Sequence, residues 1–284
     1  MNFKTGKWAA QIIDLQHGDG SWGYFHTLSM PTKKQPITTE QALRRLRVLG
    51  FTSEDQPVRR ALVYIDKCLS GEISIPDYNE VKPDWPLFLR TMFAANMKLF
   101  SPGHEAASAI ASEWAGVIEK AFSSGVFNQE KYDEAYGAVL RPKSKKIDYF
   151  KSFVNFYPIA LLPGLLPPET ERLMLEHVLN YPGGIYYVGY NRPLTALPPV
   201  FASLETSRCI ASFELLSNFA TSREKLSFAV DWLNANKDER GQWDLGPKAK
   251  DGIYFPLSDS WRDAGDRKAD CTRRIGALLN KLVS

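Results

Sequence analysis

The chain alternates between stretches in which apolar residues recur every three or four positions and shorter stretches rich in Gly, Pro and polar residues. Such spacing is typical of amphipathic α-helices, and no runs of alternating Val and Ile indicate β-strands. Five helical stretches each end near a glycine, and a second helical stretch follows each glycine after a loop of variable length. The first set covers 3–16, 56–69, 104–122, 167–181 and 221–236, and the second covers 37–50, 84–100, 147–157, 204–219 and 269–283.

The glycines that follow the first helix of each pair predict an internal repeat. Gly18, Gly71, Gly125, Gly183 and Gly241 are spaced by 53, 54, 58 and 58 residues. Glycine can adopt a positive φ where a helix stops, and regular spacing along a whole chain indicates a repeat architecture. We therefore expect one all-α domain over 1–284, built from about five helical hairpins.

Two of the turns carry Gly and Trp together after an amphipathic helix, as DGSWG at 19–23 and GQWDLG at 241–246. In these residues the chain resembles the QW-type repeats of squalene–hopene and oxidosqualene cyclases. More broadly it is similar to the α/α-toroid superfamily of terpenoid cyclases and protein prenyltransferase β-subunits. The resemblance implies an α/α toroid, or barrel, in which outer and inner helix layers enclose a central cavity. We expect Trp22 and Trp243 to be buried between successive helix pairs.

The acid and metal motifs of that superfamily are missing. The chain contains neither a D-x-D-D run nor a D-D-x-x-D run. The zinc site of the prenyltransferases needs an Asp and a Cys separated by one residue and a later His, whereas Asp270 and Cys271 are adjacent and no His follows. The three cysteines are scattered along the chain, which predicts neither a disulfide framework nor a Cys-rich zinc site. We expect no metal and no cofactor.

Acidic and basic residues recur instead near the starts of the second helices, three or four positions apart. These are Glu40 with Arg44, Asp148 with Lys151, Glu205 with Arg208, and Asp270 with Arg273 and Arg274. Two interpretations are open. The pairs could be exposed and each contribute about 0.3–0.5 kcal/mol to stability, or they could surround the mouth of the predicted cavity.

In the second interpretation the arginines grip a carboxylate or phosphate through bidentate contacts. Glu40 and Glu205 then orient Arg44 and Arg208, and Asp270 is the candidate catalytic residue, for proton transfer. Asp270 and Arg273 would stand at the start of the last helix, where free N–H groups favour an anion.

Four aromatic residues in loops rich in Gly and Pro are candidates for a pocket wall, with core packing as the alternative. They are Tyr186, Tyr187, Tyr190 and Trp261. A cavity with aromatic walls and a few fixed polar groups is a usual small-molecule site.

Composition narrows the choice of partners. The net charge is +3 and no dense Lys/Arg run is present, so no nucleic acid is expected as a partner. No apolar stretch is long enough to span a membrane, and we expect a cytoplasmic protein.

The leading hypothesis is a terpenoid-cyclase-like enzyme that acts on a small, partly apolar, anionic substrate. The alternatives are a non-catalytic module that binds a lipid-like ligand or metabolite, and a structural toroid that contacts a protein. The oligomeric state is not predicted.

Overall fold

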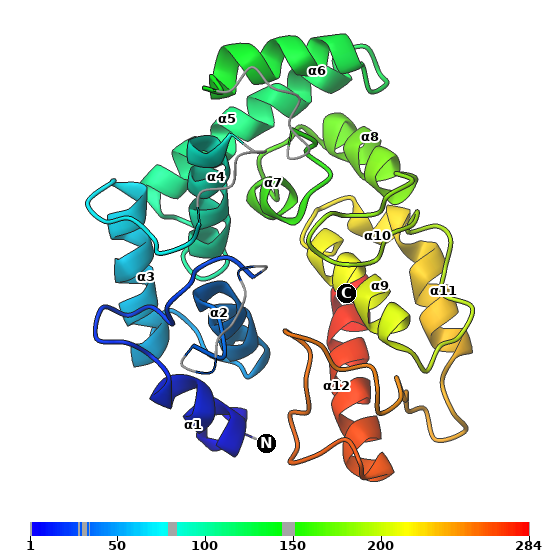
Figure 1. Ribbon diagram of the computed structural model, residues 1–284. Helices are drawn as coiled ribbons and strands as arrows, with labels where there is room; N and C mark the ends of the chain where they lie inside the picture. The colour runs from blue at the N-terminus through cyan, green and yellow to red at the C-terminus, as the bar shows by residue number, and fades with distance from the viewer. Residues whose placement is uncertain are drawn as a thin grey trace.

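The computed structural model of the protein describes residues 2–27, 29, 33, 35–78, 84–143 and 151–283 (Figure 1). Within these residues the chain forms twelve α-helices and no β-strand, which confirms the all-α prediction for the described part of the chain. The helices are α1 (Lys7–Asp14), α2 (Thr39–Val48), α3 (Gln56–Leu69), α4 (Trp85–Lys98), α5 (Glu105–Phe122), α6 (Gln129–Ala135), α7 (Phe156–Leu161), α8 (Pro168–Leu179), α9 (Leu204–Leu216), α10 (Ser222–Lys225), α11 (Ser227–Ala235) and α12 (Ala264–Val283).

The helices follow the predicted order of five pairs. The first helices of the pairs are α1, α3, α5, α8 and α11, and the second helices are α2, α4, α7, α9 and α12. Figure 1 shows the second helices nearer the middle of the molecule and the first helices outside them. We call the two sets inner and outer helices. No helix in the described residues combines the length and the apolar character needed to cross a membrane.

The turns that follow the five outer helices share one backbone geometry. In each turn a glycine with a positive φ, between 63° and 97°, donates its N–H to the carbonyl oxygen three residues earlier. The glycines are Gly20, Gly71, Gly125, Gly184 and Gly241. The predicted repeat is therefore present as a recurring turn.

The register of the repeat differs from the prediction at two turns. The positive φ falls at Gly20 and Gly184, and not at Gly18 and Gly183. A Cβ at Gly20 would lie 2.4 Å from the carbonyl oxygen of Arg60. Only glycine tolerates this combination of backbone angle and close contact. Where two glycines lie close together, the sequence does not show which of them contacts the backbone of another segment.

Trp22 and Trp243 are anchored in the same way. The indole Nε1 of Trp22 donates to the carbonyl oxygen of Ile12 at 2.6 Å, and that of Trp243 donates to Leu233 at 2.7 Å. Each partner lies ten residues earlier, at the end of the preceding outer helix. The backbone N–H of each Trp donates to a threonine hydroxyl of the next inner helix, Thr39 and Thr272. The two residues are only 1% and 6% exposed, which confirms that they are buried. Their hydrogen bonds join the outer and inner helix of one pair, whereas the prediction placed them between successive pairs.

The third inner helix is shorter than predicted. Of the expected helix over 147–157, residues 147–150 lie outside the described residues and 151–155 are not helical. The helix α7 begins only at Phe156, because the side chain of Asn155 accepts the N–H of Tyr157 (3.1 Å) and caps it. The pattern also missed α6 and the π-helical turn Tyr136–Leu140 that continues it.

The last inner helix begins five residues earlier than predicted, at Ala264. The side chain of Asp263 accepts a hydrogen bond from the N–H of Asp266 at 2.9 Å and so caps the first turn of α12. Asp270 and Arg273 therefore lie in the second and third turns of α12. The free N–H groups of a helix end act only within its first turn, so those of α12 do not contribute to an anion site at Asp270 and Arg273.

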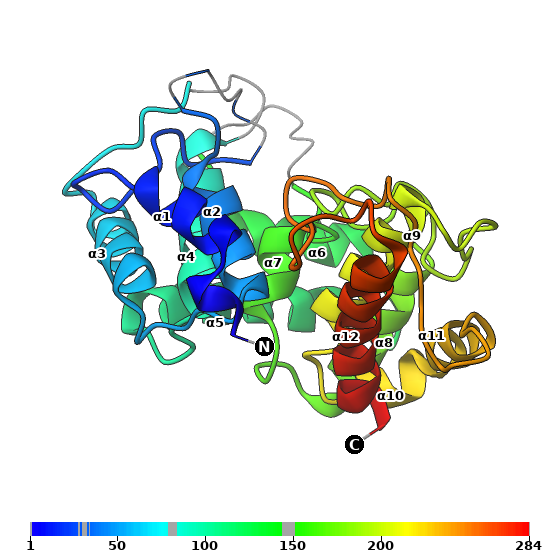
Figure 2. The same cartoon turned by 90° about the horizontal axis from the view of Figure 1, so that it is seen from below.

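The first and last helix pairs meet through the segment 244–262 that precedes α12. The indole Nε1 of Trp8 donates to the carbonyl oxygen of Ser258 at 2.8 Å, and its ring packs edge-on against Phe255. Arg45 on α2 donates to the carbonyl oxygen of Gly252 at 2.7 Å. Figures 1 and 2 both show this segment, in orange, reaching from α12 towards α1 and α2.

Candidate functional site

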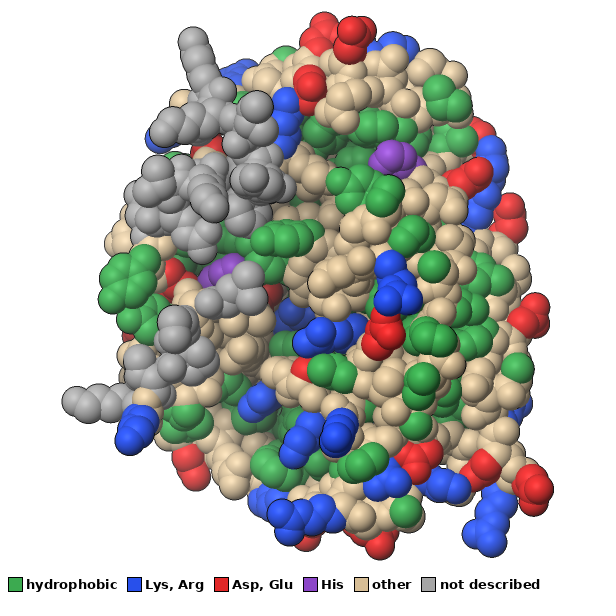
Figure 3. Space-filling view, turned by 45° about the vertical axis from the view of Figure 1, so that its right-hand side comes forward, with side chains coloured by type: hydrophobic (Ala, Val, Ile, Leu, Met, Phe, Trp, Pro, Cys, Tyr) green, Lys and Arg blue, Asp and Glu red, His purple; other side chains and the backbone are tan. Residues whose placement is uncertain are grey.

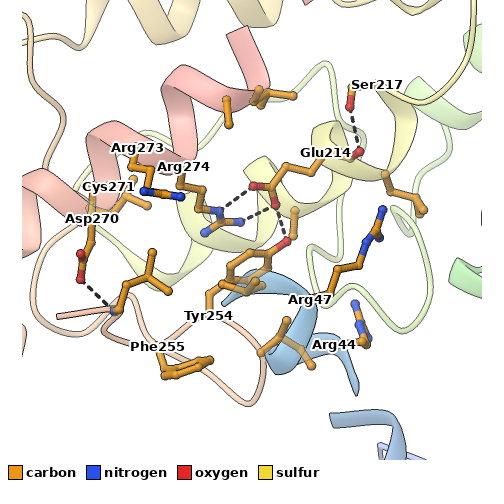
Figure 4. Close-up of a pocket in the computed structure, with 18 of the residues that line it drawn as sticks. Arg44, Arg47, Glu214, Ser217, Tyr254, Phe255, Asp270, Cys271, Arg273 and Arg274 are labelled. Carbon is orange, nitrogen blue, oxygen red and sulfur yellow. Dashed lines mark hydrogen bonds and ion pairs between the residues drawn. The ribbon is translucent and has the colours of Figure 1, made fainter. Parts of the chain in front are cut away.

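A cavity of about 310 Å³ lies between the inner helices α2, α9 and α12 and the segment 245–261 (Figure 4). Leu99, which directly follows α4, and Phe156 at the start of α7 also line it, so all five inner helices or the residues at their ends contribute. Its apolar wall is formed by Val48, Leu99, Phe156, Leu215, Leu245, Ile253, Phe255, Leu257 and Leu278. This volume suits a small molecule.

Charged side chains line the same cavity, and the positive ones are in excess. The cations are Arg44, Arg47, Arg273, Arg274 and Lys281, against the two carboxylates Glu214 and Asp270. Figure 3 shows one face of the molecule, with Lys and Arg side chains gathered in its lower middle part and acidic and basic side chains mixed along its right-hand edge. A concave site lined with three more positive than negative charges attracts anions.

Arg274, Glu214 and Tyr254 form one cluster on the cavity wall. The guanidinium of Arg274 binds both oxygens of Glu214, at 2.8 and 2.9 Å, and also the Ser207 hydroxyl at 2.7 Å. Tyr254 donates its hydroxyl to Glu214 and stacks on the guanidinium. Burial, followed by the charge of Glu214, raises the pKa of Tyr254, so its hydroxyl stays protonated. The charges of Arg274 and Glu214 compensate one another.

Asp270 holds the cavity wall in place. Its Oδ2 accepts four hydrogen bonds: from the backbone N–H groups of Leu257 (2.9 Å) and Ser258 (3.1 Å), the Ser258 hydroxyl (2.8 Å) and the indole Nε1 of Trp261 (2.7 Å). The residue predicted as the proton-transfer group thus lines the cavity, together with Trp261. Its contacts make it an anchor for the segment 257–261.

Arg44, Arg47 and Lys281 form a group of cations whose charges are not compensated. Arg44 and Arg47 lie one turn apart on α2, and Figure 4 shows them side by side. Arg44 stacks on the ring of Phe156, and Lys281 donates to the amide oxygen of Asn218 at 3.1 Å. In the described part of the chain, Glu214 is paired with Arg274, and no carboxylate is paired with these three cations.

The surroundings of these cations make their positive charge costly. Burial, together with the nearby charge of Arg44, lowers the pKa of Arg47. Burial and then the charge of Arg47 lower the pKa of Lys281, while Glu214 opposes both shifts. Both residues are nevertheless exposed, and both line the cavity. An anion bound between them would relieve the repulsion.

Arg273 reaches the cavity from α12, as predicted, and also stacks on the ring of Phe3 at 4.8 Å. It is exposed, and it lies between the cavity and the first turn of the chain. Arg44, Arg273 and Arg274 are therefore the predicted arginines that the fold brings to one cavity.

Glu40 does not reach this cavity. It is fully buried, and its Oε2 accepts hydrogen bonds from the backbone N–H of Thr27 (3.0 Å), the Thr27 hydroxyl and the hydroxyl of Tyr157 (3.0 Å). These contacts tie the first loop to α2 and α7. Glu40 and Arg44 share a helix but do not form an ion pair, because tertiary contacts draw the carboxylate into the core.

The second predicted pair is also separated. Glu205 binds Arg192 of the preceding loop at 3.0 Å, and Arg208 lies against Gly189. Neither lines the cavity formed by the described residues. The alternating ring of acids and bases that the helix starts predicted is therefore not what surrounds the cavity.

Three of the four predicted aromatic residues lie elsewhere in the fold. Tyr190 is buried and donates its hydroxyl to the carbonyl oxygen of Ala196. Tyr187, which has a positive φ of 66°, packs against Tyr157, and Tyr186 is half exposed beside it. For these residues core and loop packing is the observed role.

The sequence pattern missed four residues that shape the cavity, namely Arg47, Glu214, Tyr254 and Lys281. Arg47 could have been found, since it lies three positions after Arg44 and hence on the same helix face. The pairing of Glu214 with Arg274 joins residues 60 positions apart, and no local spacing reveals it.

Among the described residues, no cluster of three His, Cys, Asp or Glu side chains has the arrangement of a metal site. Comparison of the chain with known protein families found no match. Comparisons with curated proteins and with solved structures found no significant match either. Any functional conclusion therefore depends on the cavity and its residues.

Proposed function

We propose that the protein is an α/α toroid of the terpenoid cyclase and protein prenyltransferase type, and that its central cavity binds a small, partly apolar organic anion. Support for the toroid comes from the five helix pairs, the recurring glycine turn and the two equivalent Trp anchors. The contacts of Trp8 and Arg45 with the segment before α12 join the last pair to the first.

One observation carries the functional part of the proposal. A cavity contacted by all five inner helices has an apolar wall and an excess of three positive charges. Cations that lie close together without compensating carboxylates repel one another in the empty protein. A site with this composition is explained by a ligand that supplies both the negative charge and an apolar surface.

Binding is better supported than catalysis. A cyclase-like reaction needs a group that can deliver a proton, and both carboxylates on the cavity wall are occupied. Glu214 is held by Arg274 and Tyr254, and Asp270 holds the segment 257–261. The terpenoid-cyclase-like activity and the catalytic role of Asp270 remain predictions. The contacts favour a binding module for a metabolite or a lipid-like anion.

A cytoplasmic location belongs to the same proposal. Cys68, Cys209 and Cys271 are all free and buried. Free thiols are usual where the surroundings are reducing.

Native mass spectrometry of the purified protein tests the proposed function. We expect an organic anion to accompany the folded protein at a 1:1 ratio and to be released on denaturation. The Arg44→Ala/Arg47→Ala double variant should lose it, because charge-assisted hydrogen bonds contribute about 1.5–3 kcal/mol each.

The control variant is Arg59→Ala, an exposed arginine on α3 that lies outside the cavity and should retain the ligand. Equal ligand occupancy in the double variant, the control and the wild type would place the binding site elsewhere. If all three are empty, titration with the anions described below decides whether the cavity binds anions at all.

A further inference from the structure

We infer that the anionic end of the ligand is a doubly charged phosphate monoester group, bound between α2 and α12 by Arg44, Arg47 and Lys281. The inference rests on the proposed function and narrows it to one class of ligand. The apolar part of the ligand would then contact the apolar wall of the cavity, which includes Val48 and Leu215.

The first argument is the number of uncompensated charges at one place. Arg44 and Arg47 reach the cavity from one face of α2, and Lys281 reaches it from the last turn of α12. Arg47 interacts electrostatically with both of the others, and Glu214 offsets only part of this repulsion because Arg274 already pairs with it. A monocarboxylate supplies one negative charge, whereas a phosphate monoester supplies nearly two at neutral pH.

The second argument is geometric. Three donors that approach from two helices need an acceptor whose oxygens point in three directions. A phosphate monoester has three terminal oxygens, while a carboxylate has two oxygens in one plane. Guanidinium groups bind phosphate through two parallel N–H donors, and lysine binds it as a point charge. The three side chains therefore match a compact dianion better than a planar monoanion.

The third argument is the neighbouring wall. Val48 follows Arg47 on α2, Leu215 follows Glu214 on α9, and Leu278 lies one turn before Lys281 on α12. Apolar side chains of α2 and α12 thus adjoin the cationic group, and Leu215 of α9 lines the same cavity. A free inorganic phosphate would leave this wall without contact, whereas an alkyl or aryl ester would bury it.

Isothermal titration with three ligands of equal chain length tests the inference: hexyl phosphate, hexyl sulfate and hexanoate. Hexyl sulfate has the tetrahedral shape but one charge, and hexanoate has one charge and a planar group. At pH 7.5 we expect hexyl phosphate to bind at least about tenfold more tightly than the other two, since one further charge-assisted contact is worth that factor. The preference over hexyl sulfate, whose single charge does not change in this range, should shrink between pH 7.5 and pH 5, because the phosphate loses its second charge near pH 6.

Variants locate the site. Arg47→Gln and Lys281→Gln should each reduce the preference for hexyl phosphate, Lys281→Arg should retain it, and Arg59→Gln should behave like the wild type. Circular dichroism shows whether each variant is folded. Lys281→Arg is the matched control, because it keeps the positive charge while changing the packing of the side chain.

The outcomes separate the two proposals. If all three ligands bind equally well and Arg47→Gln weakens all of them, the cavity binds anions but the phosphate inference is wrong. If none of the three binds the wild type, both the inference and the proposed function fail. A preference for hexyl phosphate that persists unchanged in Arg47→Gln and Lys281→Gln would overturn the assignment to this site.

Discussion

At the scale of single residues, the tryptophans of the glycine turns connect the outer and inner helices of a pair. Trp22 fills space between α1 and α2 and donates its indole N–H to Ile12, while its own backbone N–H donates to Thr39. The side chain thus combines a large buried apolar surface with a satisfied polar group, which is the condition under which Trp is stable in a core.

Replacing Trp22 tests this role. Trp22→Ala should lower the free energy of unfolding by about 3–5 kcal/mol, because it opens a large cavity and removes the hydrogen bond. Trp22→Phe should cost less, since most of the ring volume remains and a neutral hydrogen bond contributes about 1 kcal/mol. Urea unfolding of both variants measures the difference. Unfolding curves for Trp22→Ala that superimpose on those of the wild type would rule out the role given to this residue.

At the scale of elements, each Trp turn must be fastened to the inner helix that follows. In the last turn this is done by Asp244, which binds Arg267 of α12 through two hydrogen bonds of 2.7 and 2.8 Å. The hydrogen bond from Arg267 holds the pKa of Asp244 below its usual value, and burial opposes the shift. Arg267 also donates to the carbonyl oxygen of Trp261, so one side chain joins the turn, the cavity wall and α12.

The lowered pKa of Asp244 has a predictable consequence for stability. An acid whose pKa is lower in the folded state stabilises the protein above its unfolded pKa, about 3.9, and loses this effect as the pH falls through the folded value. Asp244→Asn should cost about 1–2 kcal/mol at pH 7 and much less near pH 3. Urea unfolding from pH 3 to pH 7 measures it. A cost that does not change with pH would mean that the loss comes from packing and not from the ion pair.

At the scale of the whole molecule, the feature to test is the contact between the first and last helix pairs. It is made by Trp8 and Arg45 on one side and by Phe255, Ser258 and Gly252 on the other. This contact joins residues as far as 250 positions apart in the sequence. It places the segment 245–261 over the cavity between α2 and α12.

A double-mutant cycle on Trp8 and Phe255 measures this closure. The rings meet edge-on at 5.9 Å between centroids, and aromatic pairs of this kind contribute about 0.5–1.5 kcal/mol beyond burial. Trp8→Ala and Phe255→Ala should therefore cost less together than the sum of the two single variants, by about that amount. The free energies come from urea unfolding. Strict additivity would show that the ends of the chain do not depend on one another.

The sequence by itself determined most of the helices and the repeat. Apolar spacing located α2, α3, α4, α5, α8 and α9 to within a few residues, and the glycines marked the turns after the outer helices. These features are local, since the period of a helix and the positive φ of a glycine depend on neighbouring residues. The same pattern predicted that Arg44 and Arg273 face a cavity, where both lie.

Only the tertiary structure decided what each charged residue does. The i,i+3 and i,i+4 spacings correctly placed Glu40 and Arg44 on one helix, but long-range partners set their roles. Thr27 and Tyr157 draw Glu40 into the core, and the segment 257–261 occupies Asp270. The pairing of Glu214 with Arg274 joins α9 to α12, and it leaves Arg44, Arg47, Arg273 and Lys281 without a carboxylate partner among the described residues. Helical periodicity specifies which face a residue occupies, whereas the charge that remains free depends on which faces the fold brings together.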